Sequence, residues 1–128
     1  MTESLSIQEA RKLVLLSQGL PPAKPTGSAT AATLAAIERL GYVQIDTISV
    51  IQRAHHHTLW NRNPRYQPSQ LDQLITDKQV FEYWSHAAAY LPMRDYRFSL
   101  PRKQAIASGV QEHWYERDER LEKSVLRR

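Results

Sequence analysis

Residues 41–62 read GYVQIDTISVIQRAHHHTLWNR, and the spacing of the apolar side chains changes halfway along this stretch. Over residues 42–48 apolar and polar residues alternate, which predicts a strand with one buried face. Successive strand side chains point to opposite faces, so Gln44 and Asp46 should share a face, about 7 Å apart along the chain. The strand therefore presents an amide and a carboxylate together. An edge strand with a solvated polar face is the alternative interpretation.

From Ser49 onward the spacing becomes helical, and Thr47 or Ser49 is a suitable N-cap for a helix over residues 48–60. One arc of this helix is expected to face the core and contains Ile48, Ile51, Ala54, His55 and Leu59. The opposite arc contains Arg53, His56, His57 and Trp60. These cationic, titratable and aromatic side chains suit contact with phosphates and exposed bases. An ordinary solvated helix face remains the alternative.

The composition fits one soluble domain. The 128 residues include 17 Lys and Arg against 13 Asp and Glu, a net charge of +4 with a pI near 9.6. This balance permits a polyanionic partner without requiring one. The absence of cysteine excludes disulfides and thiolate chemistry. No secretion signal or membrane-length apolar run is present, so we expect a cytoplasmic protein.

Two helices are predicted before the strand. Ser6 and Glu9 have capping-box spacing, which predicts a helix over residues 7–18 that Gly19 ends. Apolar residues cover more than half of its circumference, so it should pack on two sides. A Pro- and Gly-rich loop follows over residues 20–28. Ser28 then caps a second helix, which ends at Gly41, with a narrow inward stripe formed by Leu34, Ile37 and Leu40.

Residues 61–92 alternate between loops and short elements. The Pro-broken loop over residues 61–68 carries two further candidate phosphate ligands, Arg62 and Arg65. Ser69 should cap a short helix through Leu74 or Ile75, with Leu71 and Leu74 turned inward. The aromatic residues 79–84 predict a second strand. The segment that follows ends at Pro92 and carries His86, more plausible as a structural histidine than as a catalytic one.

A long C-terminal helix over about residues 100–128 is predicted, with Ser99 and Pro101 as its cap and first turn. Its apolar stripe contains Ile106, Val110, Trp114, Leu121 and Val125. The stripe needs a partner surface, and no stop signal closes the helix. We therefore expect that the natural protein continues beyond Arg128. An exposed stripe would lead the isolated chain to self-associate or to bind the missing C-terminal portion.

Common catalytic and metal-binding motifs are absent. The side chains of His55, His56 and His57 point 100° apart on a helix, so they cannot converge on one metal ion. No local pattern supports Ser-His-Asp chemistry, and no glycine-rich phosphate loop follows a strand. We therefore predict no metal site and no cofactor.

Several segments together resemble the YcaQ/AlkZ-like DNA glycosylases. They are Gln44–Val50, Arg53–His57, Glu82–Ala88 and Tyr90–Pro92. The resemblance implies a mainly α fold with a small β component (α+β), namely the first winged-helix module of a tandem winged-helix protein. It implies double-stranded DNA as partner and hydrolysis of the N-glycosidic bond of alkylated purines, including N7-linked interstrand crosslinks, in a bacterial, nucleoid-associated setting. Family members are much longer than this chain.

The same resemblance makes Gln44 and Asp46 the catalytic motif, in its aspartate-bearing form. The chemistry agrees, because an N7-alkylguanine is already cationic and departs without an added proton. One carboxylate, Asp46, can then activate water or balance the charge that grows at the sugar, while Gln44 orients the water. The alternative function is a non-catalytic winged-helix DNA-binding module or regulator in which helix 48–60 is the recognition helix. A pure DNA binder gains nothing from a carboxylate near phosphate.

Overall fold

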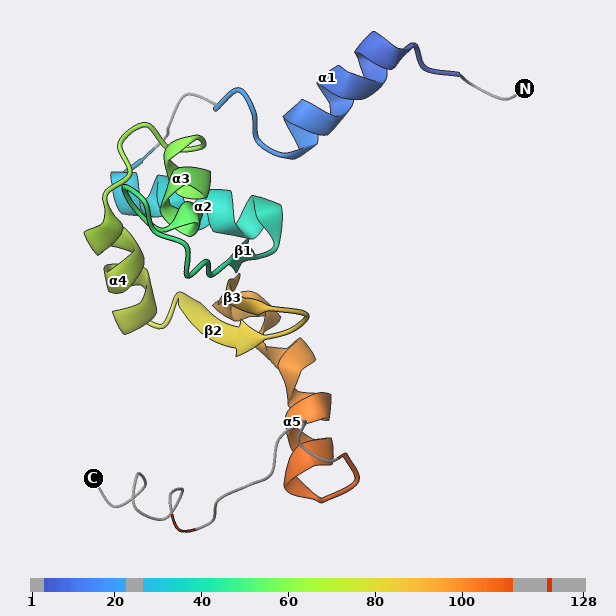
Figure 1. The fold of residues 1–128 in the computed structure, drawn as a ribbon, viewed down its shortest axis with the longest axis vertical. Coiled ribbons are helices and arrows are strands. Elements are labelled where there is room, and N and C mark those ends of the chain that lie inside the picture. Colours follow the sequence, from blue (N-terminus) through green and yellow to red (C-terminus); the bar gives the residue numbers. More distant parts are fainter. Residues whose placement is uncertain (1–3, 23–26, 112–119, 121–128) are drawn as a thin grey trace. The chain divides into compact units, whose positions relative to one another are not determined.

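The computed structural model describes residues 4–22, 27–111 and 120, and shows a small α+β protein (Figure 1). The chain divides into two compact units, Met1–Tyr96 and Arg97–Arg128. The predicted α+β class is confirmed. None of the helices in the described part of the chain is both long and apolar enough to cross a membrane.

Helix α1 (Ile7–Ser17) begins at the predicted capping box. The Ser6 backbone N–H donates to Glu9 Oε2 at 2.9 Å, and the Glu9 N–H donates to Ser6 Oγ at 3.2 Å, so two backbone donors at the helix end are satisfied. The expectation that α1 packs on two sides is wrong, because no residue of α1 is buried. The helix is formed by its own capping rather than by burial of its apolar side chains.

Helix α2 (Ala29–Leu40) has the predicted Ser28 cap and Gly41 end. The Ala31 N–H donates to Ser28 Oγ at 3.1 Å, and Gly41 has a φ of 80°, a conformation that favours glycine. Ile37 is fully buried, and the other stripe residues, Leu34 and Leu40, pack against the core. The narrow apolar stripe therefore predicted the inward face of α2 correctly.

The sheet has three antiparallel strands in the order β1-β3-β2: β1 (Val43–Gln44), β2 (Val80–Trp84) and β3 (Ala88–Pro92). Strand β2 agrees with the prediction. Strand β3 was not predicted, because its alanines carry little strand propensity; pairing with both neighbours forms it instead. Strand β1 is far shorter than the predicted strand over residues 42–48, although the Ile45 N–H still donates to Ala88 O at 2.8 Å.

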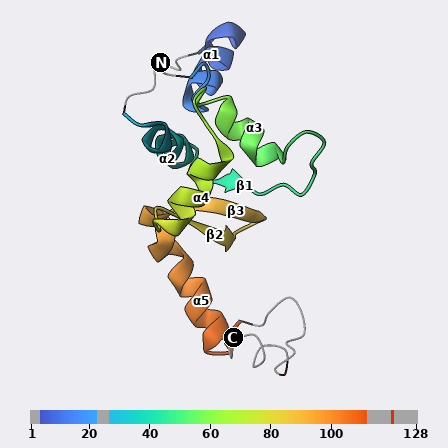
Figure 2. The same cartoon turned by 90° about the vertical axis from the view of Figure 1, so that its left-hand side faces the viewer.

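Helix α3 (Ala54–Trp60) begins later than the predicted helix over residues 48–60. Its N-cap position is Arg53, and neither Thr47 nor Ser49 caps it. Helix α4 (Pro68–Thr76) begins close to the predicted position, with Pro68 in its first turn, and it buries Leu71 and Leu74 as expected. Its N-cap position is Gln67 rather than Ser69. Figure 2 shows α2, α3 and α4 together with the sheet.

The core lies between these three helices and the sheet. Its buried side chains are Ala36, Ile37, Val43, Leu59, Tyr66, Leu71, Leu74 and Val80. A buried polar cluster ties α2 to the loop before α4. Asn63 Nδ2 donates to Ala29 O and to Thr33 Oγ1, both at 2.9 Å, and Thr33 Oγ1 donates to Gln70 Oε1 at 2.9 Å. This satisfied network fixes the path of residues 61–67.

The second unit contains α5 (Leu100–Ala107), which follows a 3-10 helix over Met93–Ser99. Pro101 lies in the first turn of α5 as predicted, but the Ser99 side chain makes no cap hydrogen bond. The predicted continuous helix over 100–128 is wrong, since α5 ends at Ala107 and Gly109 follows with a φ of 73°. Within the predicted stripe Ile106 is half-buried and Val110 is exposed. The remaining stripe residues, Trp114, Leu121 and Val125, lie outside the described residues.

Candidate active site and nucleic-acid interface

Asp46 lies just beyond β1, at the point where the chain turns out of the sheet. Its Oδ1 accepts a hydrogen bond from the Ile48 backbone N–H at 2.8 Å, a local turn that competes with strand pairing. This turn explains why the predicted strand stops early. The half-buried carboxylate keeps Oδ2, to which no hydrogen bond from the residues in the described ranges is seen.

Gln44 is an exposed residue of β1 and lies opposite Ala89 of β3. One residue, Ile45, separates it from the Asp46 turn, and the sheet anchors it through the pairing of Val43 with Tyr90. Because Asp46 lies outside the strand, strand alternation does not determine the direction of its side chain. The amide and the carboxylate are nevertheless carried by one short segment, whose first half belongs to the sheet.

His55, in the first turn of α3, contacts the backbone of Asp46. The His55 side chain is only 4% exposed, which confirms its predicted inward direction. Its Nδ1 accepts a hydrogen bond from the Asp46 backbone N–H at 3.4 Å, and its ring packs edge-on against Tyr90. Burial, reinforced by the positive charges at His56 and Arg53, lowers the pKa of His55 to about 4, although Asp46 opposes this shift. The ring is therefore neutral at pH 7, as an acceptor Nδ1 requires.

His56 and Trp60 are less exposed than predicted. His56 Nδ1 lies 2.7 Å from the hydroxyl of Tyr66, and Trp60 Nε1 donates to Tyr66 O at 3.1 Å. Burial lowers the pKa of His56 and raises that of Tyr66. Both predicted DNA contacts are thus partly occupied in holding Tyr66, a buried residue that the sequence did not single out. Within the described ranges no three metal-binding side chains gather into a site.

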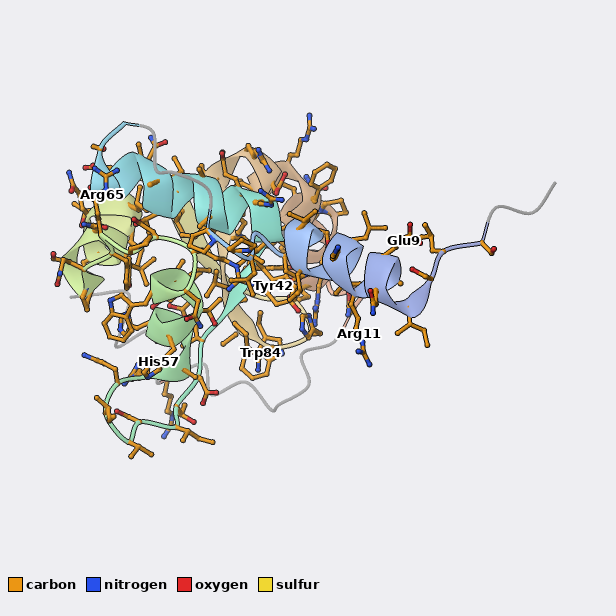
Figure 3. The ribbon with its side chains drawn as sticks, turned by 90° about the horizontal axis from the view of Figure 1, so that it is seen from above. Glu9, Arg11, Tyr42, His57, Arg65 and Trp84 are labelled. Atoms are coloured by element: carbon orange, nitrogen blue, oxygen red, sulfur yellow. The ribbon has the colours of Figure 1, made fainter. Side chains whose placement is uncertain are left out.

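The predicted basic contacts differ in how much of each side chain remains available. Arg53 is exposed, and His57 lies on the outer side of α3 (Figure 3). Arg62, by contrast, donates from Nε to Gln18 O at 2.8 Å and from Nη1 to Thr58 O at 2.9 Å. Arg65 donates to Gly27 O at 2.9 Å, beside the beginning of α2 (Figure 3). The side chains of Arg62 and Arg65 therefore connect segments of the fold through hydrogen bonds to backbone carbonyls.

The loop between β1 and α3 has an unexpected surface. The predicted helical arc placed Ile48 and Ile51 in the core, but they are 70% and 87% exposed, and Val50 is 93% exposed. The arc was wrong here because residues 48–53 form a loop, closed by an antiparallel bridge between Ser49 and Arg53. Three exposed apolar side chains, those of Ile48, Val50 and Ile51, therefore lie in the loop that begins at the Asp46 turn.

His86 lies in the turn between β2 and β3, which faces the same end of the sheet as Ile45. Its side chain is exposed. Its ring meets the Tyr42 ring edge-on at a centroid distance of 5.1 Å, and its Nδ1 lies 3.3 Å from Ser85 Oγ. The turn therefore adds an imidazole to the surface near the Gln44 segment.

Comparison with known protein families identifies the family to which the chain is similar. The family model described as DNA glycosylase AlkZ-like matches residues 37–128. The match covers β1, the Asp46 turn, α3, α4 and both strands of the hairpin. No solved structure matches the chain.

Proposed function

Because this chain belongs to the AlkZ-like family of DNA glycosylases, we propose that it excises alkylated purines such as N7-alkylguanine, including those in interstrand crosslinks, with Gln44 and Asp46 as catalytic residues. The family makes DNA repair its role and DNA its partner. One observation carries the assignment of Asp46. Its Oδ1 and its backbone N–H are each committed to one hydrogen bond, which orients the carboxylate and leaves Oδ2 for a water molecule.

The reaction needs few groups. The bond between N9 of the cationic base and C1′ of the sugar breaks, and its electron pair returns to the base, which leaves neutral. Water attacks C1′ from the opposite side, and Asp46 takes the proton that the water loses. The carboxylate also balances the positive charge on the sugar, and the Gln44 amide hydrogen-bonds the water or the sugar. The products are the released base and an abasic site in an intact strand.

The order of the helices and strands supports a winged-helix module and, with it, DNA as the substrate. Helix α2, β1, the pair α3 and α4, and the hairpin β2–β3 follow one another in the chain, and β1 pairs with β3. We propose that this is the first winged-helix module of the protein. In a helix-turn-helix the second helix enters the major groove. In the proposed module that helix would be α4, whereas the sequence analysis assigned this role to helix 48–60 in the regulator alternative.

The composition of α4 gives little support to the non-catalytic alternative, a DNA-binding regulator. Its sequence, PSQLDQLIT, contains no Lys or Arg and includes Asp72 on its exposed side. A recognition helix of a regulator normally combines base contacts with neutralisation of phosphate charge. We therefore favour the enzyme over the regulator, with the DNA approached through the β1–α3 segment.

Substitution of Asp46 tests this function. Asp46→Asn retains the Oδ1 acceptor for the Ile48 N–H and removes only the negative charge and the basicity. We expect excision from duplex DNA carrying one N7-methylguanine to fall by at least about 100-fold. Affinity for the same duplex should hold or rise, because a negative charge near phosphate is lost.

Asp77→Asn is the matched control, an exposed aspartate at the end of α4. Release of the methylated base is measured by chromatography, and the abasic site by strand cleavage after alkali. An Asp46→Asn variant within a few-fold of the wild type would show that Asp46 is structural. A wild-type chain that binds the duplex and releases no base would favour the binding module.

A further inference from the structure

The loop over residues 48–53 exposes apolar side chains where a soluble protein normally places polar ones. Val50 and Ile51 at its tip are 93% and 87% exposed, and Ile48 is 70% exposed. Figure 2 shows the loop between β1 and α3 projecting away from α2, α4 and the sheet. Such a group of side chains marks a contact surface rather than an unused part of the core.

The loop is held in shape by its own hydrogen bonds. At one end, Asp46 Oδ1 accepts the Ile48 N–H at 2.8 Å, and at the other the Arg53 N–H donates to Gln52 Oε1 at 3.2 Å. The bridge between Ser49 and Arg53 closes the loop. These contacts hold the tip residues Val50 and Ile51 in a defined position. Binding through them should therefore cost little additional conformational entropy.

The charges around the loop indicate which partner fits it. Arg53, at its base, is exposed, and its guanidinium makes no hydrogen bond or ion pair with residues of the described ranges. An apolar tip beside a cation matches duplex DNA, whose phosphates flank a stack of apolar base faces. Apolar wedges of this kind separate base steps in other DNA-binding proteins.

We propose that Val50 and Ile51 insert into the base stack next to the damaged nucleotide and that Arg53 holds the adjacent phosphate. This inference rests on the proposed function, because the wedge would open the stack at the base whose sugar faces Asp46. The hydrogen bond from Ile48 to Asp46 couples the two features, since a single turn positions both the carboxylate and the wedge. A base that is tied to the opposite strand cannot swing fully out, so local opening of the stack is the distortion that such a substrate allows.

The test replaces both tip residues, with the double variant Val50→Ser/Ile51→Ser. Both side chains lie in solvent, so the fold should be unaffected. The matched control is Val110→Ser, the same change at another exposed valine. The probe is a duplex in which 2-aminopurine neighbours either an N7-methylguanine or a stable abasic analogue, because 2-aminopurine fluorescence rises when the base unstacks.

We expect saturating wild-type protein and the Val110→Ser variant to raise the fluorescence, and the double variant to leave it near the level of unbound DNA. Excision from the duplex should fall by about tenfold or more in the double variant, since the cost of unstacking is no longer offset. Excision from the same lesion in single-stranded DNA should change by less than about twofold, because no stacked duplex has to be opened.

The outcomes separate the wedge from the glycosylase. If the wild type raises the fluorescence but releases no base while the double variant does neither, the wedge stands and the proposed activity fails. If the double variant excises and unstacks like the wild type, the wedge is refuted and the activity stands. A double variant that changes only self-association, measured by light scattering, would assign the loop to a protein contact and also refute the wedge. A chain that does not bind duplex DNA would refute both.

Discussion

Replacing His55 with asparagine should remove a large part of the pH dependence of stability below neutral pH. The imidazole is buried and neutral in the folded chain, with its pKa lowered from 6.5 to about 4, chiefly by burial. Between pH 6.5 and pH 4 the His55 imidazole is therefore protonated in the unfolded chain but remains neutral in the folded chain. The contribution of His55 to the free energy of unfolding therefore has its full value above pH 6.5 and is lost as the pH falls from 6.5 towards 4.

The size of the effect follows from the two pKa values. At pH 5 the proton-binding terms of the unfolded and folded states differ by a factor of about 30, which corresponds to about 2 kcal/mol of unfolding free energy. His55→Asn removes this term but retains a side-chain acceptor for the Asp46 N–H. His57→Asn removes an exposed imidazole from the same helix and serves as the control.

The assay is urea denaturation at pH 7 and pH 5, followed by circular dichroism, for the wild type and both variants. The decrease in unfolding free energy from pH 7 to pH 5 should be about 2 kcal/mol smaller in His55→Asn than in the wild type. The His57→Asn variant should behave like the wild type. Equal decreases in the wild type and His55→Asn would refute the reasoning, because they would mean that His55 takes up its proton equally well in both states.

Two further predictions concern the buried polar contacts. Tyr66→Phe removes the hydroxyl that lies 2.7 Å from His56 Nδ1, and should lower the free energy of unfolding at pH 7 by about 1–2 kcal/mol; an unchanged urea midpoint would contradict the role of this contact. Asn63→Ala removes the amide that donates to Thr33 Oγ1 and to Ala29 O and should cost about 3 kcal/mol, whereas Asn61→Ala, at an exposed neighbour, should cost less than about 0.5 kcal/mol. Comparable losses in the two asparagine variants, measured by the same denaturation, would argue against the network.

The sequence predicted those features whose physics is local. The caps at Ser6 and Ser28 were readable because a hydroxyl at the right spacing satisfies a backbone donor of its own helix. The inward side chains of Ile37, Leu71 and Leu74 were readable because each lies on a helix whose apolar stripe is narrow. The family resemblance, carried by the segments around Gln44 and His86, is confirmed by the match over residues 37–128.

The errors arose where two local patterns competed or where tertiary pairing decided. Asp46 fits the alternating pattern of a strand, but its carboxylate accepts a hydrogen bond from the Ile48 N–H and forms a turn. The strand therefore ends before Asp46, and the following helix begins later than predicted. Ile48 and Ile51 have helical spacing, and periodicity cannot distinguish a buried arc from an exposed apolar loop. Tyr66 is buried and contacts His56 and Trp60 of α3 through tertiary packing, which no periodic pattern indicates. The catalytic roles of Gln44 and Asp46 stay predictions.

The attachment of α1 differs in kind from that of the other helices. Arg39 donates to Leu16 O and to Ser17 O, and Arg62 donates to Gln18 O, so the described contacts fasten the end of α1 by side-chain donors to backbone carbonyls. No side chain of α1 is buried, so releasing this helix would expose no core surface. Its backbone amides should therefore exchange hydrogen with solvent through a local opening of low free energy. The amides of α2 near Ile37 should exchange only when the core unfolds. The chain thus contains a helix that can open locally and a core that opens only on unfolding, and the side chains of Arg39 and Arg62 connect the two.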